Sequence, residues 1–452
     1  MHQPQINYRN WYMVSFFLGT AEGLIGTFFP IIFIHKGGTP FLLGIFTGVV
    51  ALGGTFQMIW GNLIDRYQIP KKIVLGAQST NIVATSLMAI SGKAPPYGMA
   101  RVLNAMSNNA HSNADNYIRS AYFPSMNRGK IGNIFMGLNL LGVGIAVLIT
   151  GYVYDTKGYD YAWVIHAIAG ICFVLALLLY VKSVPEFDIK HVRDEQLAHQ
   201  INSDQAQALY SPKEKWLIVK RSRGLIPFII GYLIFNFGVA ISGPFFILDL
   251  STRWGLSGIQ LAILLTFNSA MQVIVIFLVI PVIDFIDRKI LFTISIGLAT
   301  LPAVGMIIPI SMAVNIFSSP LIYWMVIYFM SSIGWGLVNA LLLTLIIDYV
   351  HPKIRATVTA SFGTMQALLV FIGSILSGYL AEFVVPSVVW IFAISLCFRV
   401  VGFAILLVKT PSPPIPMADF SLRRQIFMAK VMSTFERGML WIPGRSSVRK
   451  KK

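Results

Sequence analysis

The chain has 452 residues, of which 56% are hydrophobic and 12% are charged, and its formal net charge is +17. An ordinary soluble domain carries about 25% charged residues, so this composition excludes a soluble globular protein, a disordered segment and a small disulfide-stabilised module. The positive charge does not predict a nucleic-acid partner, because the basic residues lie between long hydrophobic runs. Cys172 and Cys397 both lie inside such runs, so neither a disulfide nor a metal site is predicted.

Twelve runs are long and apolar enough to cross a membrane. A bilayer core about 30 Å thick needs roughly 20 apolar residues per helix. The first run is long and lacks a clear cleavage site, so we interpret it as a retained helix rather than a signal peptide. The fourth has the weakest hydropathy. In chain order, the predicted helices span residues 11–34, 41–63, 72–91, 97–122, 131–154, 161–181, 224–248, 255–283, 290–312, 320–347, 354–380 and 387–409.

A polar stretch between the sixth and seventh helices divides the chain. We therefore predict an N-terminal six-helix bundle over residues 1–181, a linker over 182–223, a C-terminal six-helix bundle over 224–409 and a basic tail over 410–452. If both termini are cytoplasmic, 29 of the 35 Lys and Arg residues lie in cytoplasmic segments. This bias predicts a multi-pass protein of the plasma membrane with both termini in the cytoplasm.

The two predicted bundles repeat each other in sequence. Six helices per half make the repeat parallel, with a pseudo-two-fold axis along the membrane normal. An offset of 214 residues places Pro30 on Pro244, Gly44 on Gly258 and Ile45 on Ile259. An offset of 227 places Arg128 on Arg355, Phe135 on Phe362, Gly151 on Gly378, Tyr152 on Tyr379, Trp163 on Trp390 and Asp155 on Glu382.

The loop between the second and third helices carries a motif, Gly61-Asn-Leu-Ile-Asp65-Arg66, followed by the basic pair Lys71-Lys72. This pattern resembles the signature loop of the major facilitator superfamily, although the basic pair comes two residues late. The loop from Asp284 to Lys289 resembles its counterpart in the second half, without the glycine, and the loops around Arg128 and Arg355 resemble two further loops of the family. The resemblance covers residues 11–409. It implies an all-α membrane protein of twelve transmembrane helices in two six-helix bundles.

The resemblance and the clustered charges predict a conformational latch at the cytoplasmic face. A short turn with opposite charges can pair with helix ends in one conformation and release them in another. Asp65 would pair with the start of the eleventh helix, and Arg66 and Arg119 would share Asp115. The alternative is that these charges only mark the cytoplasmic interface. The predicted latch residues are Gly61, Asp65, Arg66, Lys71, Lys72, Asp115, Arg119, Arg128, Asp284, Arg288, Lys289 and Arg355.

Glu22 lies eleven residues into the first predicted helix. At about 1.5 Å per residue, its carboxylate is about 16 Å along the helix, near the membrane midplane. A charge at this depth costs at least about 2.5 kcal/mol, so it needs a partner or a function. A carboxylate shielded from bulk water binds a proton more readily, which predicts a proton-coupling role. The alternative is a structural hydrogen bond to a neighbouring helix.

The fourth helix carries a polar stripe. Arg101, Asn104, Asn108, His111 and Asp115 follow one another at steps of three and four residues, so they share one helix face. Such a face must contact protein or water rather than lipid. The resemblance implies that the first, fourth, seventh and tenth helices line a central cavity, so Arg101, Asn104 and Asn108 are predicted to bind substrate. His111 is a candidate proton relay, with a structural, hydrogen-bonded histidine as the alternative.

The second half offers fewer polar candidates. Asn236 on the seventh helix and Trp335 and Asn339 on the tenth are predicted to complete the substrate site. Interhelical hydrogen bonding explains each asparagine equally well. Arg399 lies about midway through the twelfth helix, and we expect it to be structural, with a partner that the sequence does not name.

Together these features predict a secondary active transporter of a small polar or anionic solute, coupled to protons and working by alternating access. Two alternatives stay open: proton-coupled efflux of amphipathic compounds, and a membrane receptor or scaffold that transports nothing. No P-loop, metal-binding motif or nucleophile elbow occurs in the sequence, so we predict neither enzymatic activity nor a cofactor. We expect a monomer that contacts anionic lipid through an amphipathic helix in its basic tail.

Overall fold

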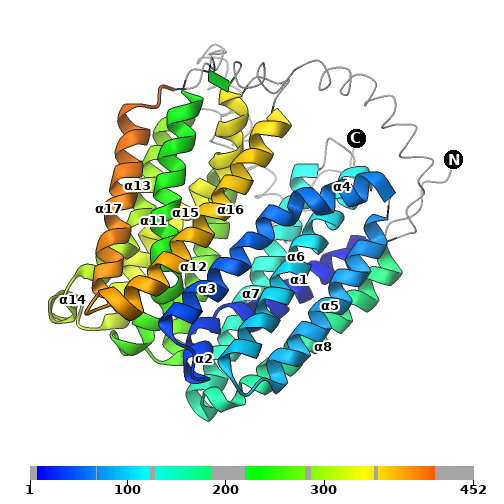
Figure 1. Cartoon of the computed structure of the whole chain (residues 1–452), viewed down its shortest axis with the longest axis horizontal. Coiled ribbons are helices and arrows are strands. Elements are labelled where there is room, and N and C mark those ends of the chain that lie inside the picture. Colours follow the sequence, from blue (N-terminus) through cyan, green and yellow to red (C-terminus); the bar gives the residue numbers. More distant parts are fainter. Residues whose placement is uncertain are drawn as a thin grey trace, which may run out of the picture.

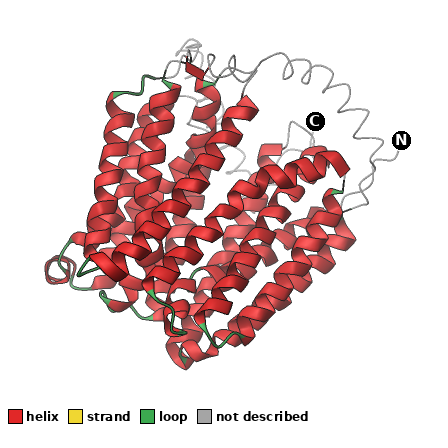
Figure 2. Ribbon diagram, in the orientation of Figure 1, coloured by secondary structure: helices red, strands yellow, loops and turns green. Residues whose placement is uncertain are grey.

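The computed structural model describes residues 8–67, 69–122, 128–184, 219–220, 222, 224–279, 287–350 and 355–412. These residues form long helices joined by short connections, with no strand among them (Figures 1 and 2). The prediction of an all-α protein is therefore confirmed. Most of the predicted linker, and the amphipathic helix predicted in the tail, lie outside the described residues.

The elements follow one another in two series. The first comprises α1 (Tyr8–Gly26), α2 (Phe29–His35), α3 (Pro40–Leu52), the 3-10 turn η1 (Gly53–Phe56), α4 (Gln57–Tyr67), α5 (Pro70–Ile90), α6 (Ala94–Tyr122), α7 (Arg128–Lys157), η3 (Tyr159–Tyr161) and α8 (Ala162–Ser183). The second comprises α11 (Leu225–Thr252), α12 (Gly258–Val279), α13 (Arg288–Ile307), α14 (Ile310–Phe317), α15 (Pro320–Tyr349), α16 (Arg355–Tyr379), the π turn η5 (Leu380–Val384) and α17 (Val389–Val408).

Eleven helical segments of the described chain are long and apolar enough to cross a membrane. The remaining predicted span corresponds to α6, which has 29 residues and carries the polar stripe. Its polar face lowers the hydropathy below that of the other spans. With α6 included, each of the twelve predicted spans corresponds to a segment of the structure.

Two predicted spans of the first half are interrupted. The span 11–34 is divided between α1 and α2, because Pro30, in the first turn of α2, has no N–H to donate to the preceding turn. The span 41–63 contains the turn η1. A Cβ on Gly53 would lie 2.5 Å from the side-chain nitrogen of Asn109, so this glycine allows α6 to approach the turn closely.

The ninth predicted helix, 290–312, ends early at Ile307. Ile308 is extended, as residues that precede a proline usually are, and Pro309 is the N-cap residue of the separate short helix α14. The hydrophobic pattern did not reveal this boundary, because both helices are apolar.

The helices pack as two bundles, which confirms the predicted layout. In the first, α1 packs against α7 and α8, and α5 packs against α6 and α8. In the second, α11 packs against α16 and α17, and α13 packs against α15 and α17.

We call the face where α8 ends and α11 begins the linker face, and the other the opposite face. In Figure 1 the bundles lie close together at the opposite face and apart at the linker face.

Among the described residues, the most extensive crossings between the bundles are those of α3 with α16 and of α7 with α12. Glycine allows the close approach in both. A Cβ on Gly44 would lie 2.8 Å from the Cα of Gly378, and a Cβ on Gly151 would lie 2.4 Å from the carbonyl oxygen of Gly258. These four glycines are the ones that the sequence offsets of 214 and 227 superpose, so the internal repeat relates the two crossings.

We expect Gly151→Val to prevent the bundles from closing at the opposite face. The new side chain would clash with backbone atoms of α12, so the helices must separate by about 1 Å or more at the crossing. The measurement is the distance between spin labels at Lys93 and Asn315, which are exposed at the opposite face of the first and second bundles. Gly137→Val in the same helix is the control, because a Cβ there meets open space. An unchanged distance in Gly151→Val would contradict this role of the crossing.

Candidate functional site

The middle of the first bundle holds a carboxylate and a guanidinium in contact. Glu22 lies near the middle of the segment formed by α1 and α2, and Arg101 lies on α6. The Nη1 of Arg101 is 3.4 Å from the Oε2 of Glu22. A Cβ on Gly26 would lie 3.2 Å from the guanidinium, so this glycine leaves room for it. The pair is largely shielded, since 15% of the Arg101 side chain and 31% of the Glu22 side chain is exposed.

Three asparagines close this pair into a ring of hydrogen bonds. Arg101 donates to the Oδ1 of Asn104, whose Nδ2 donates to the Oδ1 of Asn81 over 3.1 Å. The Nδ2 of Asn81 donates to the Oδ1 of Asn108 over 2.7 Å, and Asn108 donates to the Oε1 of Glu22. We call these five residues the polar ring. Every amide donates with its nitrogen and accepts with its oxygen, so the amide chain runs in one direction from Arg101 to Glu22, and the direct contact between Arg101 and Glu22 closes the ring.

Asn81, on α5, is the ring residue that the sequence analysis missed. It is fully buried. A signal for it was present, because Gln78, Asn81 and Thr85 follow one another at steps of three and four residues. This is the same spacing that revealed the stripe on the fourth helix, and it marks the face of α5 that packs against α6.

A polar cavity of about 290 Å³ lies beside the polar ring. Its lining runs from Glu22 and Asn108, past His111, to Asp115 and Arg119 near the linker-face end of α6. The other lining residues are Ser15, Leu18, Ser112, Asn116, Gly132, Phe135, Met136, Asn139 and Phe173. The cavity is large enough for several waters. It therefore gives the Glu22 carboxylate a polar route toward the linker face.

His111 lies in the cavity wall and is held by a neighbouring side chain. Its Nδ1 is 3.0 Å from the Nε2 of Gln78, and the residue is buried. A Gln78 amide that donates to Nδ1 leaves the imidazole proton on Nε2. The structure thus places His111 between Glu22 and Asp115 along the cavity, in a position that suits either the predicted relay or a structural role.

Asp115 is buried beneath the first helix. Its Oδ1 accepts a 3.2 Å hydrogen bond from the Trp11 indole, and its Oδ2 lies 2.5 Å from the Nη2 of Arg119. The predicted latch has Arg66 on the same carboxylate, but the structure does not bring these two residues together. Arg66 is exposed near the end of α4, and its guanidinium lies 5.4 Å from the ring centroid of Tyr67.

The other latch residues that the structure describes lie toward the linker face. The Nη1 of Arg288 lies 2.7 Å from the Oδ2 of Asp348, a partner that the sequence analysis missed, and this pair joins α13 to α15. Lys289 donates to the carbonyl of Leu407 in α17 over 3.1 Å. Gly61 lies in α4, and Lys71 and Lys72 lie in α5. The structure does not describe the side chains of Asp65, Arg128 and Arg355. Asp284 lies outside the described residues.

The three candidates in the second bundle contact residues of that bundle. Asn236 on α11 is buried and donates a 3.3 Å hydrogen bond to the hydroxyl of Tyr232. Trp335 packs against a phenylalanine of α11, and Asn339 donates to a glutamine of α12 over 3.4 Å. The structure therefore does not join these residues to the polar ring.

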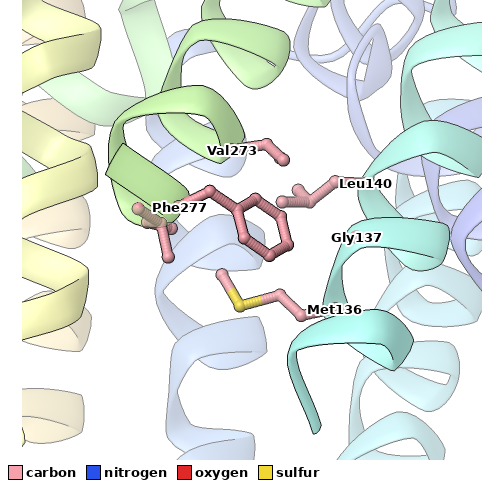
Figure 3. A pocket seen from close by; sticks show the side chains of 6 residues that line it. Met136, Gly137, Leu140, Val273 and Phe277 are labelled. Atoms are coloured by element: carbon pink, nitrogen blue, oxygen red, sulfur yellow. The ribbon is translucent and has the colours of Figure 1, made fainter. Parts of the chain in front are cut away.

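A smaller pocket between α7 and α12 is entirely apolar. Met136 and Leu140 face Val273 and Phe277 across it, and Gly137 and Ile276 complete the lining (Figure 3). Its volume of about 10 Å³ is too small for a solute. The cavity beside the polar ring is therefore the candidate functional site.

Comparisons with known proteins agree with this fold. The model of the Major Facilitator Superfamily matches residues 11–368 and 228–444. A D-xylose-proton symporter superposes with a TM-score of 0.67 at 13% identity, over 90% of this chain and 98% of that chain. The nucleoside transporter NupG gives 0.65 at 15% identity, over 88% and 98% of the two chains, and a POT family transporter gives 0.64 at 13% identity, over 89% and 94%. No curated protein sequence matches this chain.

Proposed function

We propose a solute class and a coupling mechanism on the premise that this chain belongs to the major facilitator superfamily and is a multi-pass membrane transporter. The proposal is symport of a small polar or anionic solute with protons, by alternating access between the two bundles. The observation that carries it is the polar ring, in which a carboxylate and a guanidinium meet in the middle of the first bundle, beside a polar cavity.

Proton binding at Glu22 would change the ring at one point. The ionised carboxylate accepts hydrogen bonds from both Arg101 and Asn108. A protonated carboxyl is neutral and must donate with one oxygen, so it holds Arg101 less strongly. The released guanidinium then offers its donors to a carboxylate, phosphate or other polar group of the solute. Protonation of Glu22 and solute binding at Arg101 favour each other in this scheme, as symport requires.

The polar residues that line the cavity favour a polar solute over an apolar one. The cavity lining includes the exposed polar side chains of Ser112 and Asn116, and an apolar ligand that displaced water from such groups would leave them unsatisfied at a cost of about 1–3 kcal/mol each. The names of the similar structures specify D-xylose, nucleosides and peptides, which are polar. We propose that Asn236, Trp335 and Asn339 complete the site from the second bundle when the linker face closes.

The membrane orientation follows from the basic residues. We propose that the linker face is cytoplasmic, because the loops on that side carry most of the Lys and Arg residues. The described conformation, closed at the opposite face, would then be open toward the cytoplasm. The charged residues of the linker face would form the latch when that face closes. We further propose a monomer in the plasma membrane, with the basic tail on anionic lipid.

The test is proton movement in proteoliposomes that contain a pH-sensitive dye. Pools of organic acids, sugars, nucleosides and amino acids are added outside, and one pool is expected to acidify the liposome interior, which the dye reports, as protons enter with the solute. Proton movement in response to amphipathic dyes, with none for these pools, would identify the efflux alternative. A solute that binds without crossing the membrane would identify a receptor.

A further inference from the structure

Two carboxylates reach from one bundle to the other at the opposite face. Asp155, in the last turn of α7, accepts a 3.2 Å hydrogen bond from the backbone N–H of Gly258, the first residue of α12. Glu382, in the turn η5 that follows α16, accepts a 2.8 Å hydrogen bond from the backbone N–H of Phe41, the second residue of α3. Each carboxylate therefore caps a helix N-terminus that belongs to the other bundle.

The caps complete the hydrogen bonding of the first turn of α3. The first backbone N–H groups of a helix have no partner within the helix. Pro40 has no N–H, and the N–H of Leu42 is bonded to the side chain of Thr39 over 3.3 Å. The N–H of Phe41 is the donor between them, and Glu382 accepts from it.

The start of α12 is arranged in the same way. Ser257 and Gln260 cap each other, with the backbone N–H of Ser257 bonded to the Gln260 side chain over 3.0 Å and the N–H of Gln260 bonded to the Ser257 hydroxyl over 3.4 Å. The N–H of Gly258 is left for Asp155. In both helices, local residues satisfy part of the first turn, and a carboxylate from the other bundle satisfies a further donor.

The position of each acid is unfavourable within its own helix. The C-terminal end of a helix carries partial negative charge, which repels a carboxylate, whereas an N-terminal end attracts one. Asp155 and Glu382 both lie at or just beyond the C-terminal end of their own helix. The helix N-terminus that faces each of them offsets this repulsion only while the bundles are together.

The internal repeat relates the two caps. The offset of 227 residues that superposes Gly151 on Gly378 also superposes Asp155 on Glu382, so each acid follows a crossing glycine by one helical turn. The N–H groups that donate to the two acids lie at different helix positions. Gly258 is the first residue of α12, whereas Phe41 is the second residue of α3. Acids at equivalent positions of the repeat thus each accept a hydrogen bond from a helix N-terminus of the other bundle.

We propose that Asp155 and Glu382 are positioning residues that stabilise the conformation closed at the opposite face. When the bundles separate there, both carboxylates lose their N–H partners and both helices lose a cap. The pair therefore sets part of the free-energy difference between the two alternating-access conformations. The inference relies on the bundle motion of the proposed function, but not on a particular solute or on proton coupling.

Spin-label distances test the inference without any solute. Cys172 and Cys397 are replaced. Labels are placed at Lys93 and Asn315 on the opposite face, and at Lys182 and Lys409 on the linker face, and all four residues are exposed. The test variants are Asp155→Ala, Glu382→Ala and the double variant. Asp155→Asn and Glu382→Gln retain an acceptor oxygen without the charge. Asp160→Ala is the matched control, because Asp160 is an exposed acid on the same face that pairs with His35 inside the first bundle.

The double alanine variant is expected to raise the population ratio of open to closed opposite-face conformations by about three- to thirtyfold, since each carboxylate at a helix N-terminus contributes about 0.3–1 kcal/mol. The single alanine variants should raise this population ratio by less than the double variant does. The amide variants should give ratios between those of wild type and the alanine variants, and the Asp160→Ala control should give the wild-type ratio. In the same variants, the distance between the two labels on the linker face should become shorter. High salt should reduce the difference, because the acids are exposed.

A second measurement detects rare openings. Ala262 is fully buried in the α7–α12 crossing, with its methyl group next to Gly151. An Ala262→Cys reporter should react with a maleimide faster in the double alanine background, by the same factor as the population shift. Unchanged distances together with an unchanged reaction rate would overturn the inference. Loss of proton coupling with an intact cap effect would instead count against the proposed function alone.

Discussion

Glu22→Gln is expected to reduce solute-driven proton movement to the level of empty liposomes, while exchange of labelled for unlabelled solute continues. The amide neither binds nor releases a proton at the working pH. It has one acceptor oxygen where the carboxylate has two, so it satisfies either Arg101 or Asn108 and presents its NH₂ group to the other. The measurement compares dye-reported proton flux with solute counterflow in the same proteoliposomes.

The control for this substitution is Asp160→Asn, which makes the same chemical change at an exposed carboxylate far from the polar ring. It should leave proton flux at the wild-type level. Proton flux that persists in Glu22→Gln would contradict the assignment of Glu22 as the coupling acid. Loss of counterflow together with proton flux would indicate that Glu22 acts in solute binding or in folding.

Arg399→Met is expected to lower the free energy of unfolding by about 2–5 kcal/mol. Arg399 is 4% exposed, and its guanidinium joins three helices. It donates to the Ser395 hydroxyl of its own helix over 3.1 Å, to the Ala299 carbonyl of α13 over 3.1 Å and to the Ser242 hydroxyl of α11 over 2.7 Å. Among the described residues no carboxylate forms a salt bridge with it, so neutral acceptors hold this cation.

Whether Arg399→Met destabilises the protein depends on the relative sizes of two free energies, the cost of burying the cation and the gain from its hydrogen bonds. A cation at bilayer depth costs about 2.5–3.5 kcal/mol, whereas each hydrogen bond from a charged group contributes about 1.5–3 kcal/mol. Three such bonds exceed the cost, so the substitution should destabilise. Arg399→Lys should fall between wild type and Arg399→Met, because one ammonium cannot reproduce the planar fork of donors.

The measurement for Arg399 is the unfolding temperature of the purified protein in detergent. Lys409→Met is the control, since Lys409 is an exposed cation directly after the same helix. Its unfolding temperature should match wild type. An unfolding temperature of Arg399→Met at or above wild type would show that desolvation of the guanidinium outweighs its hydrogen bonds.

The candidate site was only partly predictable from the residues. The stripe from Arg101 to Asp115 was visible because five polar residues repeat at helical spacing in an otherwise apolar segment. The depth of Glu22 followed from the start of its helix. Asn81 belongs to a similar but shorter polar pattern with Gln78 and Thr85, and it was missed because the pattern on one helix does not indicate which neighbour that face will contact.

Charged residues at the helix ends were predicted less well. The pairing of Arg66 with Asp115 did not occur, because Asp115 is buried beneath Trp11 while Arg66 lies exposed near the end of α4. Asp348 was not considered, although it lies 2.7 Å from Arg288. Such contacts depend on the depth and rotation of two packed helices, which a loop motif does not specify.

The amino-acid sequence by itself determined the twelve apolar spans, the two-fold repeat, the basic bias of one face and the polar stripe on α6. Each of these is a property of the composition or periodicity of single segments, or a constant offset between two segments. Only the tertiary structure decided which side chains meet: the closure of the polar ring, the acceptors of Arg399 and the caps that Asp155 and Glu382 place on the other bundle. The physical reason is that helices in lipid are apolar on nearly every side, so their hydrophobic pattern determines that they cross the membrane but leaves open which face each turns toward its neighbours.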